Sequence, residues 1–119
     1  MSQPPIQMYH NPRCTKSRAT LALLQERGLA PQVIEYLQHP PKAAELKTVL
    51  RKLGLKPEAL VRKGEVIYKE KYAGKSLSDA QWIDAMVANP ILIERPIVVV
   101  GERAAIGRPP ENVLEILPR

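Results

Sequence analysis

Apolar and polar residues alternate in some stretches of the chain and recur with a helical period in others, and these patterns predict its elements. Residues 5–9 alternate as a short strand does, and residues 32–37 form a second run typical of a strand. Between them, residues 15–27 have helical periodicity, and Gly28 is the residue type at which such a helix ends. Strand, helix and strand form a βαβ unit, whose two strands should be parallel. The side of this helix expected to face the core carries Ala19, Ala22, Leu23 and Glu26.

The middle of the chain, about residues 42–89, predicts helices and no strand. Its first helix has apolar residues at positions i, i+3, i+4 and i+7, and its last begins with a Ser-x-x-Gln capping box at residues 78–81. Proline and glycine residues separate the segments. The predicted helical segments are residues 42–53, 57–62, 65–74 and 79–88.

Strands return near the C-terminus. Residues 97–100 and 104–106 flank Gly101 and Glu102, which is the pattern of a hairpin with a tight turn. A final helix is expected over residues 110–117. The order βαβ, then helices, then ββα predicts an α/β sandwich with a mixed sheet of four strands. The apolar side of the final helix is expected to hold Val113, Leu114 and Leu117.

Composition narrows the function classes. The chain has 119 residues, of which 45% are hydrophobic, so residues 1–119 are expected to form one domain. No stretch approaches the ~18–20 apolar residues of a membrane span. Residues 1–5 lack the basic and apolar regions of a secretion signal and are expected to be a loose leader. The net charge of +6 favours anionic partners, either a polyanion or a small oxyanion, although an aromatic content of 4% supplies few platforms for stacked bases.

The single cysteine, Cys14, lies in the segment M-Y-H-N-P-R-C-T-K-S-R over residues 8–18. Turn residues in this segment separate the first predicted strand from the first helix, so Cys14 is expected at the start of that helix. Helix N-termini favour anions, and Arg13, Lys16 and Arg18 add positive charge, so we expect a reactive thiolate. The alternative is a buried, inert thiol, as most lone cysteines are.

His10 precedes the cysteine by four residues. It could support the thiolate as an imidazolium or through a hydrogen bond, although a solvated turn histidine fits the pattern equally well. A lone cysteine makes no internal disulfide, which fits a reducing cytoplasm. Disulfide chemistry at this sulfur therefore needs a thiol from another molecule. No spacing typical of metal ligands occurs, so we expect no metal site.

Three arginines stand at breaks between the predicted elements: Arg62, Arg95 and Arg108. A guanidinium group presents a planar fork of donors that suits a tetrahedral oxyanion. Sequence spacing does not show whether the three converge, and each alone is explained better by a solvated surface charge. Pro96 begins a strand without a donor for the sheet, and a cis bond before it would turn the chain sharply and aim Arg95 toward the site.

Four separated motifs together resemble one family. They are Y-H-N-P-R-C-T-K-S-R, L-V-R-K, N-P-I-L-I-E-R-P-I-V-V-V and I-G-R-P-P-E-N-V-L-E-I-L, in that order along the chain. From about Met8 to Pro118 the chain resembles the glutaredoxin-coupled arsenate reductase (ArsC) family. The resemblance implies a thioredoxin-like three-layer sandwich, with the helical insertion at about residues 42–89 and a cis Pro96.

The resemblance also implies an enzyme that reduces arsenate to arsenite in the cytoplasm. It assigns the nucleophile to Cys14 and assistance in its ionisation to His10, and it places Asn11 and Thr15 around the thiolate. It implies no bound cofactor, with glutathione as co-substrate and glutaredoxin as protein partner, and no membrane or nucleic-acid partner. Arsenate or a similar oxyanion is expected to bind to Arg62, Arg95 and Arg108.

Two alternatives stay open. Relatives of the Spx type share the fold and regulate transcription by binding RNA polymerase, and many carry C-x-x-C. This chain has C-x-x-S, from Cys14 to Ser17, so a disulfide switch within the loop is impossible. The other alternative is a glutathione-linked thiol oxidoreductase with a different substrate.

Overall fold

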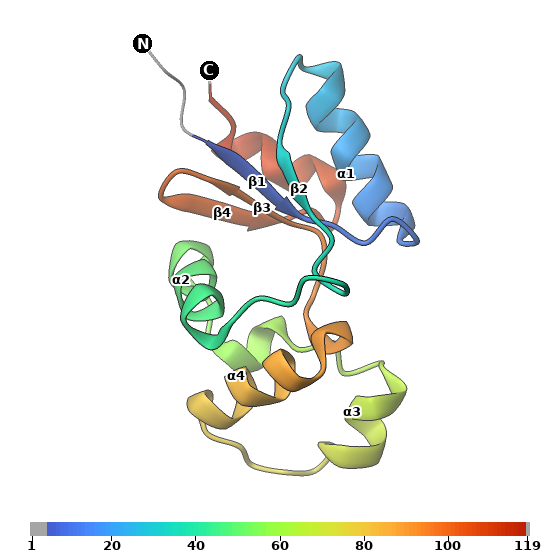
Figure 1. The fold of residues 1–119 in the computed structure, drawn as a ribbon, viewed down its shortest axis with the longest axis vertical. Coiled ribbons are helices and arrows are strands. Elements are labelled where there is room, and N and C mark those ends of the chain that lie inside the picture. The colour runs from blue at the N-terminus through green and yellow to red at the C-terminus, as the bar shows by residue number, and fades with distance from the viewer. Residues whose placement is uncertain (1–4, 119) are drawn as a thin grey trace. The chain divides into compact units, whose positions relative to one another are not determined.

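The computed structural model describes residues 5–118 (Figure 1). It divides into two compact units, the described parts of Met1–His39 with Arg95–Arg119, and Pro40–Glu94. The leader predicted over residues 1–5 lies outside the described residues except for Pro5. The helices are α1 (Thr15–Glu26), α2 (Ala43–Leu53), α3 (Val66–Lys71) and α4 (Asp79–Ala88), with 3₁₀ helices η1 (Pro57–Leu60), η2 (Pro90–Leu92) and η3 (Pro110–Ile116). The strands are β1 (Ile6–Tyr9), β2 (Gln32–Ile34), β3 (Ile97–Val100) and β4 (Arg103–Ile106).

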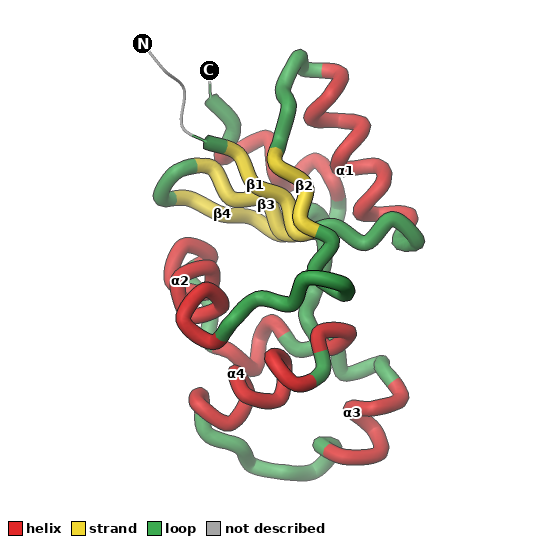
Figure 2. The backbone as a smooth tube through the Cα atoms, in the orientation of Figure 1, coloured by secondary structure: helices red, strands yellow, loops and turns green. Residues whose placement is uncertain are grey.

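The first unit contains a four-stranded sheet in the order β2-β1-β3-β4 (Figure 2). Strand β1 pairs in parallel with β2 and antiparallel with β3, and β3 and β4 form an antiparallel hairpin. The predicted βαβ unit, the hairpin and the mixed sheet are therefore confirmed. Because β1 and β3 are antiparallel neighbours, the chain that follows β1 and the chain that precedes β3 lie next to each other at the same end of the sheet.

One buried cluster of this unit lies on one face of the sheet. Met8 of β1 pairs with Val98 of β3, so both side chains point to the same face. Helix α1 and η3 lie together on that side of the sheet (Figure 1) and contribute Leu24, Val113 and Ile116 to one buried cluster with these strand residues. Each fully buried aliphatic side chain contributes about 1.5–3 kcal/mol, which fixes α1 against the strand that precedes it.

The buried face of α1 differs from the predicted one. Ala19, Ala22 and Glu26 are exposed and Leu23 is half-buried, whereas the buried residues are Ser17, Thr20 and Leu24. The positions of these three, i, i+3 and i+7, still lie on one side of a helix. Their burial was missed because hydrophobic periodicity counts only apolar residues, and a hydroxyl is buried at low cost once it is hydrogen-bonded.

Two other predicted elements change at their ends. Strand β2 stops at Ile34, because the backbone N–H groups of Gln38 and His39 both donate to the Glu35 carbonyl and close a turn, at 3.0 and 2.9 Å. The predicted C-terminal helix is a 3₁₀ helix, η3, whose tighter winding brings every third residue to one side. Val113 and Ile116 are therefore buried, while the predicted Leu114 and Leu117 are half-buried.

The second unit is helical, and residues 42–89 contain no strand, as predicted. Helix α4 contacts α2, η1 and η2. The predicted capping box is present at its start: Gln81 N–H donates to Ser78 Oγ at 3.2 Å, and Ser78 N–H donates to Gln81 Oε1 at 2.9 Å. Within residues 5–118, no helix is long and apolar enough to cross a membrane.

Candidate active site around Cys14

Cys14 is the N-cap residue of α1, with φ −92° and ψ 123°. Its N–H donates to the Asn11 carbonyl at 3.0 Å, and its carbonyl accepts the first helical hydrogen bond, from Arg18 N–H at 3.0 Å. The prediction that this residue lies where a strand gives way to a helix is confirmed. The N–H groups of the first turn have no partner inside the helix, and the positive end of the dipole lies there, so the position favours an anion.

The loop that carries Cys14 lies at the surface although the cysteine itself is mostly covered. Cys14 keeps 8% of its surface exposed, and Arg13 and Thr15 on either side of it are exposed. A thiol in this setting is shielded from bulk water by the loop yet lies beside polar, cationic residues, unlike an inert cysteine deep in an apolar core.

Two predicted site residues, Asn11 and Thr15, hold the loop in shape. Asn11 Oδ1 accepts a hydrogen bond from Arg13 N–H at 3.0 Å, while its carbonyl receives the N–H of Cys14. Arg18 reaches back from the helix and donates to the Pro12 carbonyl at 2.9 Å and to Thr15 Oγ1 at 3.4 Å. The guanidinium group of Arg18 is thus fixed against the cysteine loop, where its charge adds to the helix dipole.

His10 lies directly after β1 and is 6% exposed. Its Nδ1 lies 2.6 Å from Ser17 Oγ. Burial lowers the pKa of His10; Glu35 opposes this effect with its negative charge, and Arg18 reinforces it with its positive charge. The neutral imidazole is therefore favoured near neutral pH. Of the two roles considered from the sequence, the imidazolium is disfavoured, and support of the thiolate through a hydrogen bond stays a prediction.

The strand register brings Arg95 and Arg108 to the edge of the sheet at which the cysteine loop begins. Tyr9, the last residue of β1, pairs with Ile97, the first residue of β3, and Ile97 pairs with Ile106, the last residue of β4. Arg95 comes two residues before this row and Arg108 two residues after it. The bonds that join each arginine to the following proline are both cis, as expected for Arg95 and not foreseen for Arg108.

The two arginines differ in burial. Arg95 is half-buried and its Nε and Nη1 atoms are buried, whereas Arg108 is exposed. A half-buried guanidinium group is held in place by its surroundings, and an exposed one is accessible to a ligand from solvent.

Gly107 directly follows β4 and allows the chain to pass close to α1 just before Arg108. A Cβ atom at this position would lie 2.5 Å from Thr20 Oγ1 and 2.8 Å from Pro96 Cγ. The Gly107 N–H also donates to the Pro96 carbonyl at 2.9 Å, so the two proline-arginine turns are tied together.

Arg62 belongs to the second unit. Its Nη1 lies 2.7 Å from Glu65 Oε2 and its Nε 3.7 Å from Glu94 Oε1, and its N–H donates to the Leu92 carbonyl at 2.7 Å. The side chain is 21% exposed. Arg62 is therefore held by carboxylates of its own unit, and its binding of an oxyanion stays a prediction.

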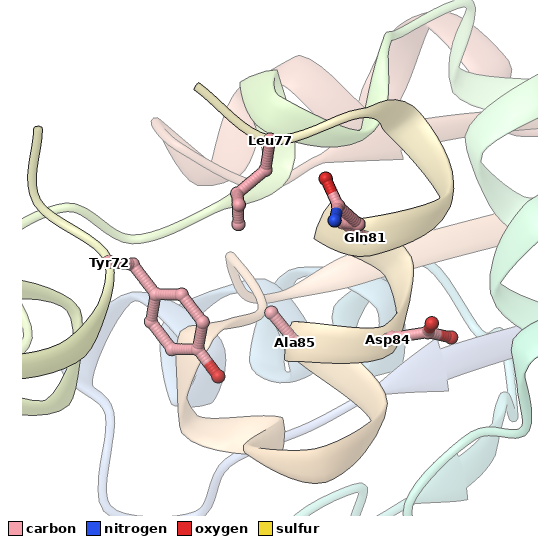
Figure 3. Close-up of a pocket in the computed structure, with 5 residues that line it drawn as sticks. All are labelled: Tyr72, Leu77, Gln81, Asp84 and Ala85. Atoms are coloured by element: carbon pink, nitrogen blue, oxygen red, sulfur yellow. The ribbon is translucent and has the colours of Figure 1, made fainter. Parts of the chain in front are cut away.

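A pocket in the second unit contains none of the predicted site residues. Tyr72 closes one side of it, opposite Ala85 and Gln81 of α4 (Figure 3). Leu77 and Asp84 complete the lining. All of the predicted site residues except Arg62 belong to the first unit.

Comparison with known proteins adds evidence of a different kind. A profile described as the ArsC family matches residues 9–116. The "Arsenate reductase" of Neisseria meningitidis serogroup A is 44% identical over 116 residues, covering 96% of this chain and 99% of that protein. "Uncharacterized protein YfgD" of Escherichia coli K12 is 53% identical over 114 residues, covering 94% and 96%. The solved structure "Arsenate reductase from Vibrio cholerae" has a TM-score of 0.93 and 52% identity, covering 98% of this chain and 100% of that one.

Proposed function

This chain belongs to the ArsC family, and we propose that it reduces arsenate to arsenite with Cys14 as the nucleophile. The observation that carries the proposal is the position of the chain's single cysteine as the N-cap of α1. The first turn of a helix has N–H groups without partners inside the helix, and beside the N-cap residue these would stabilise both a thiolate and the oxyanion that it attacks.

The substrate would be held by charge and by hydrogen bonds. Arsenate is a tetrahedral oxyanion, and a guanidinium fork donates two parallel hydrogen bonds to such a group. Arg95 and Arg108 leave the sheet at the edge where the cysteine loop begins, so both are candidates for this contact. Arg62 is proposed as the third binding residue, on the strength of its motif alone.

The first step is a substitution at arsenic. The Cys14 thiolate forms a sulfur–arsenic bond, one arsenic–oxygen bond breaks, and the leaving oxygen departs as water after it is protonated. Arsenic stays pentavalent in this step. Glutathione then attacks the same arsenic through its thiolate and displaces a second water, so that arsenic bridges two sulfur atoms.

The second step transfers electrons. A thiolate of glutaredoxin attacks the glutathione sulfur and forms a disulfide with it, and the electron pair of the broken arsenic–sulfur bond stays on arsenic. Arsenic becomes trivalent, and hydrolysis of its bond to Cys14 releases arsenite and restores the thiol. Because the chain has a single cysteine, both reducing thiols must come from other molecules, which suits the cytoplasm, where glutathione is kept reduced.

A coupled assay tests this function. We expect arsenate-dependent oxidation of NADPH in the presence of glutathione, glutaredoxin and glutathione reductase, and its loss in Cys14→Ser. Equal rates for the wild type and this variant would rule out the mechanism. Replacing glutathione and glutaredoxin by thioredoxin and its reductase should abolish turnover. Turnover of a glutathione mixed disulfide without any response to arsenate would instead favour a general thiol oxidoreductase.

A further inference from the structure

Ser17 connects three parts of the cysteine loop through one buried hydroxyl. It lies in the first turn of α1, three residues after Cys14, and none of its surface is exposed. Its Oγ accepts a hydrogen bond from Asn11 N–H at 3.0 Å and lies 2.6 Å from His10 Nδ1. The end of β1, the loop and the helix are thus held together at a single atom.

The hydrogen atoms at this hydroxyl can be accounted for. Ser17 Oγ carries one hydrogen and two lone pairs, and Asn11 N–H occupies one lone pair. If His10 Nδ1 also donated to it, the hydroxyl hydrogen would need another acceptor, and the hydrogen bonds of residues 5–118 include none for it. A buried hydroxyl without an acceptor is costly, so Ser17 is the donor and His10 Nδ1 the acceptor.

We propose that Ser17 is a positioning residue that holds His10 in the neutral tautomer with its hydrogen on Nε2. The ring then carries an N–H donor at Nε2, which would serve the Cys14 thiolate or an arsenate oxygen during the substitution. This use of the donor rests on the proposed function, whereas the tautomer itself does not.

The arrangement explains how His10 assists a thiolate without becoming a cation. A neutral imidazole has one donor and one acceptor nitrogen, and the partner at the acceptor decides which nitrogen keeps the hydrogen. Without the Ser17 hydroxyl, the buried Nδ1 of His10 has two options. It stays without a hydrogen-bond donor, or it takes the ring hydrogen from Nε2. In the latter case Nε2 would become an acceptor, which repels an anionic sulfur instead of stabilising it.

Nuclear magnetic resonance tests the tautomer directly. In protein labelled with ¹⁵N, long-range proton–nitrogen correlations distinguish the two ring nitrogens, and exposed His39 is an internal reference. We expect the Nε2–H tautomer alone for His10 in the wild type, and a mixture in Ser17→Ala. A wild-type spectrum with the hydrogen on Nδ1, or an unchanged tautomer in Ser17→Ala, would overturn the proposal. The wild-type measurement needs no variant, so it decides even if Ser17→Ala folds poorly.

Reactivity provides the second readout. Loss of one hydrogen bond to a charged group corresponds to about a tenfold change in rate or equilibrium. Alkylation of Cys14 by iodoacetamide at neutral pH should therefore be about tenfold slower in Ser17→Ala than in the wild type. The kcat with arsenate should fall by a similar factor, with little change in KM. Ser17→Thr keeps the hydroxyl and should restore the tautomer. Unchanged alkylation in Ser17→Ala would refute the link to the sulfur.

Thr20→Val is the matched control. Thr20 is the next buried hydroxyl on the same helix face, but its Oγ1 donates to the Lys16 carbonyl at 2.8 Å and has no link to His10. Thr20→Val should leave the His10 tautomer and the alkylation rate as in the wild type; equal effects of both substitutions would show a merely structural role for Ser17. If the wild type fails to turn over arsenate, the proposed function fails, while the spectrum and the alkylation rates still decide on Ser17.

Discussion

Replacement of Gly107 by alanine should destabilise the protein because the added methyl group meets atoms that cannot easily move. The new Cβ would lie 2.5 Å from Thr20 Oγ1, 2.8 Å from Pro96 Cγ and 3.1 Å from Thr20 Cγ2. Thr20 is fully buried in α1, and Pro96 is buried directly before β3. Forcing a group into such a packed site costs about 1–3 kcal/mol.

A smaller effect acts in the opposite direction. Gly107 does not have a positive φ, so alanine at this position has no backbone strain. Replacing a glycine also lowers the conformational entropy of the unfolded chain, which raises the free energy of unfolding by about 0.4–1 kcal/mol. The net loss for Gly107→Ala is therefore about 1–2 kcal/mol in the free energy of unfolding. Urea unfolding followed by circular dichroism measures it as a lower midpoint at unchanged slope.

Two further variants separate the contact from the glycine effect. Gly64 also lacks a positive φ and has no atom within 4 Å of its added Cβ, so Gly64→Ala should leave stability unchanged or raise it by up to about 1 kcal/mol. Thr20→Ala removes two of the three clashing atoms, so the double variant with Gly107→Ala should lose less than the sum of the single losses. Equal stability of Gly107→Ala and the wild type, or additivity in this cycle, would refute the reasoning.

Three other predictions test separate parts of the account. Ser78→Ala should lower the free energy of unfolding by about 1 kcal/mol, because it removes the cap of α4, and an unchanged urea midpoint would contradict it. The pKa of His10 is lower in the folded protein than the ordinary 6.5, so the unfolded state takes up the proton at a higher pH than the folded state. The free energy of unfolding should therefore fall as pH decreases through about 6.5, and His10→Gln should remove this part of the pH dependence. An identical pH dependence in the wild type and His10→Gln would contradict this contribution of His10. Arg62→Gln should raise the KM for arsenate, and it should lower the free energy of unfolding by less than about 1 kcal/mol because its partly exposed ion pairs are weak. Arg51→Gln, at an exposed position of α2, is the control, and an equal KM for the two variants would show that Arg62 does not bind the substrate.

The position of Cys14 could be predicted because it follows from local chemistry. A strand pattern, turn residues and a helical pattern follow one another within residues 5–27. The strand and the helix are recognised by their different periodicities and the turn by its residue types. The capping box of α4 and the glycine after α2, Gly54, are local in the same way, and Gly54 has the positive φ of a helix end. Features that depend on a few neighbouring residues were thus predicted within one to three positions.

Ser17, Thr20 and Gly107 could not be assigned their roles from the sequence, because each depends on atoms distant along the chain. Ser17 is buried through its contacts with the end of β1 and the loop, and Gly107 is required by its approach to α1. Hydrophobic periodicity treats a hydroxyl as a surface residue, so it chose Ala19 and Ala22 for the buried face instead. The motifs therefore identified the site, but not the residues that hold it together.

The arginines show a second limit of local reasoning. Convergence of Arg95 and Arg108 on one sheet edge follows from strand register, which no spacing reveals. Burial also separates the two, since Arg95 has buried guanidinium nitrogens and Arg108 is exposed. The convergence of the two arginines and their different burial are therefore visible only in the folded structure.

The most direct test is a crystal of the protein soaked with arsenate and glutathione. The account predicts arsenic bonded to the sulfur of Cys14, with guanidinium groups of Arg95 and Arg108 on its oxygens. Arsenic bound away from this sulfur, or a site left empty at a concentration that supports turnover, would contradict it.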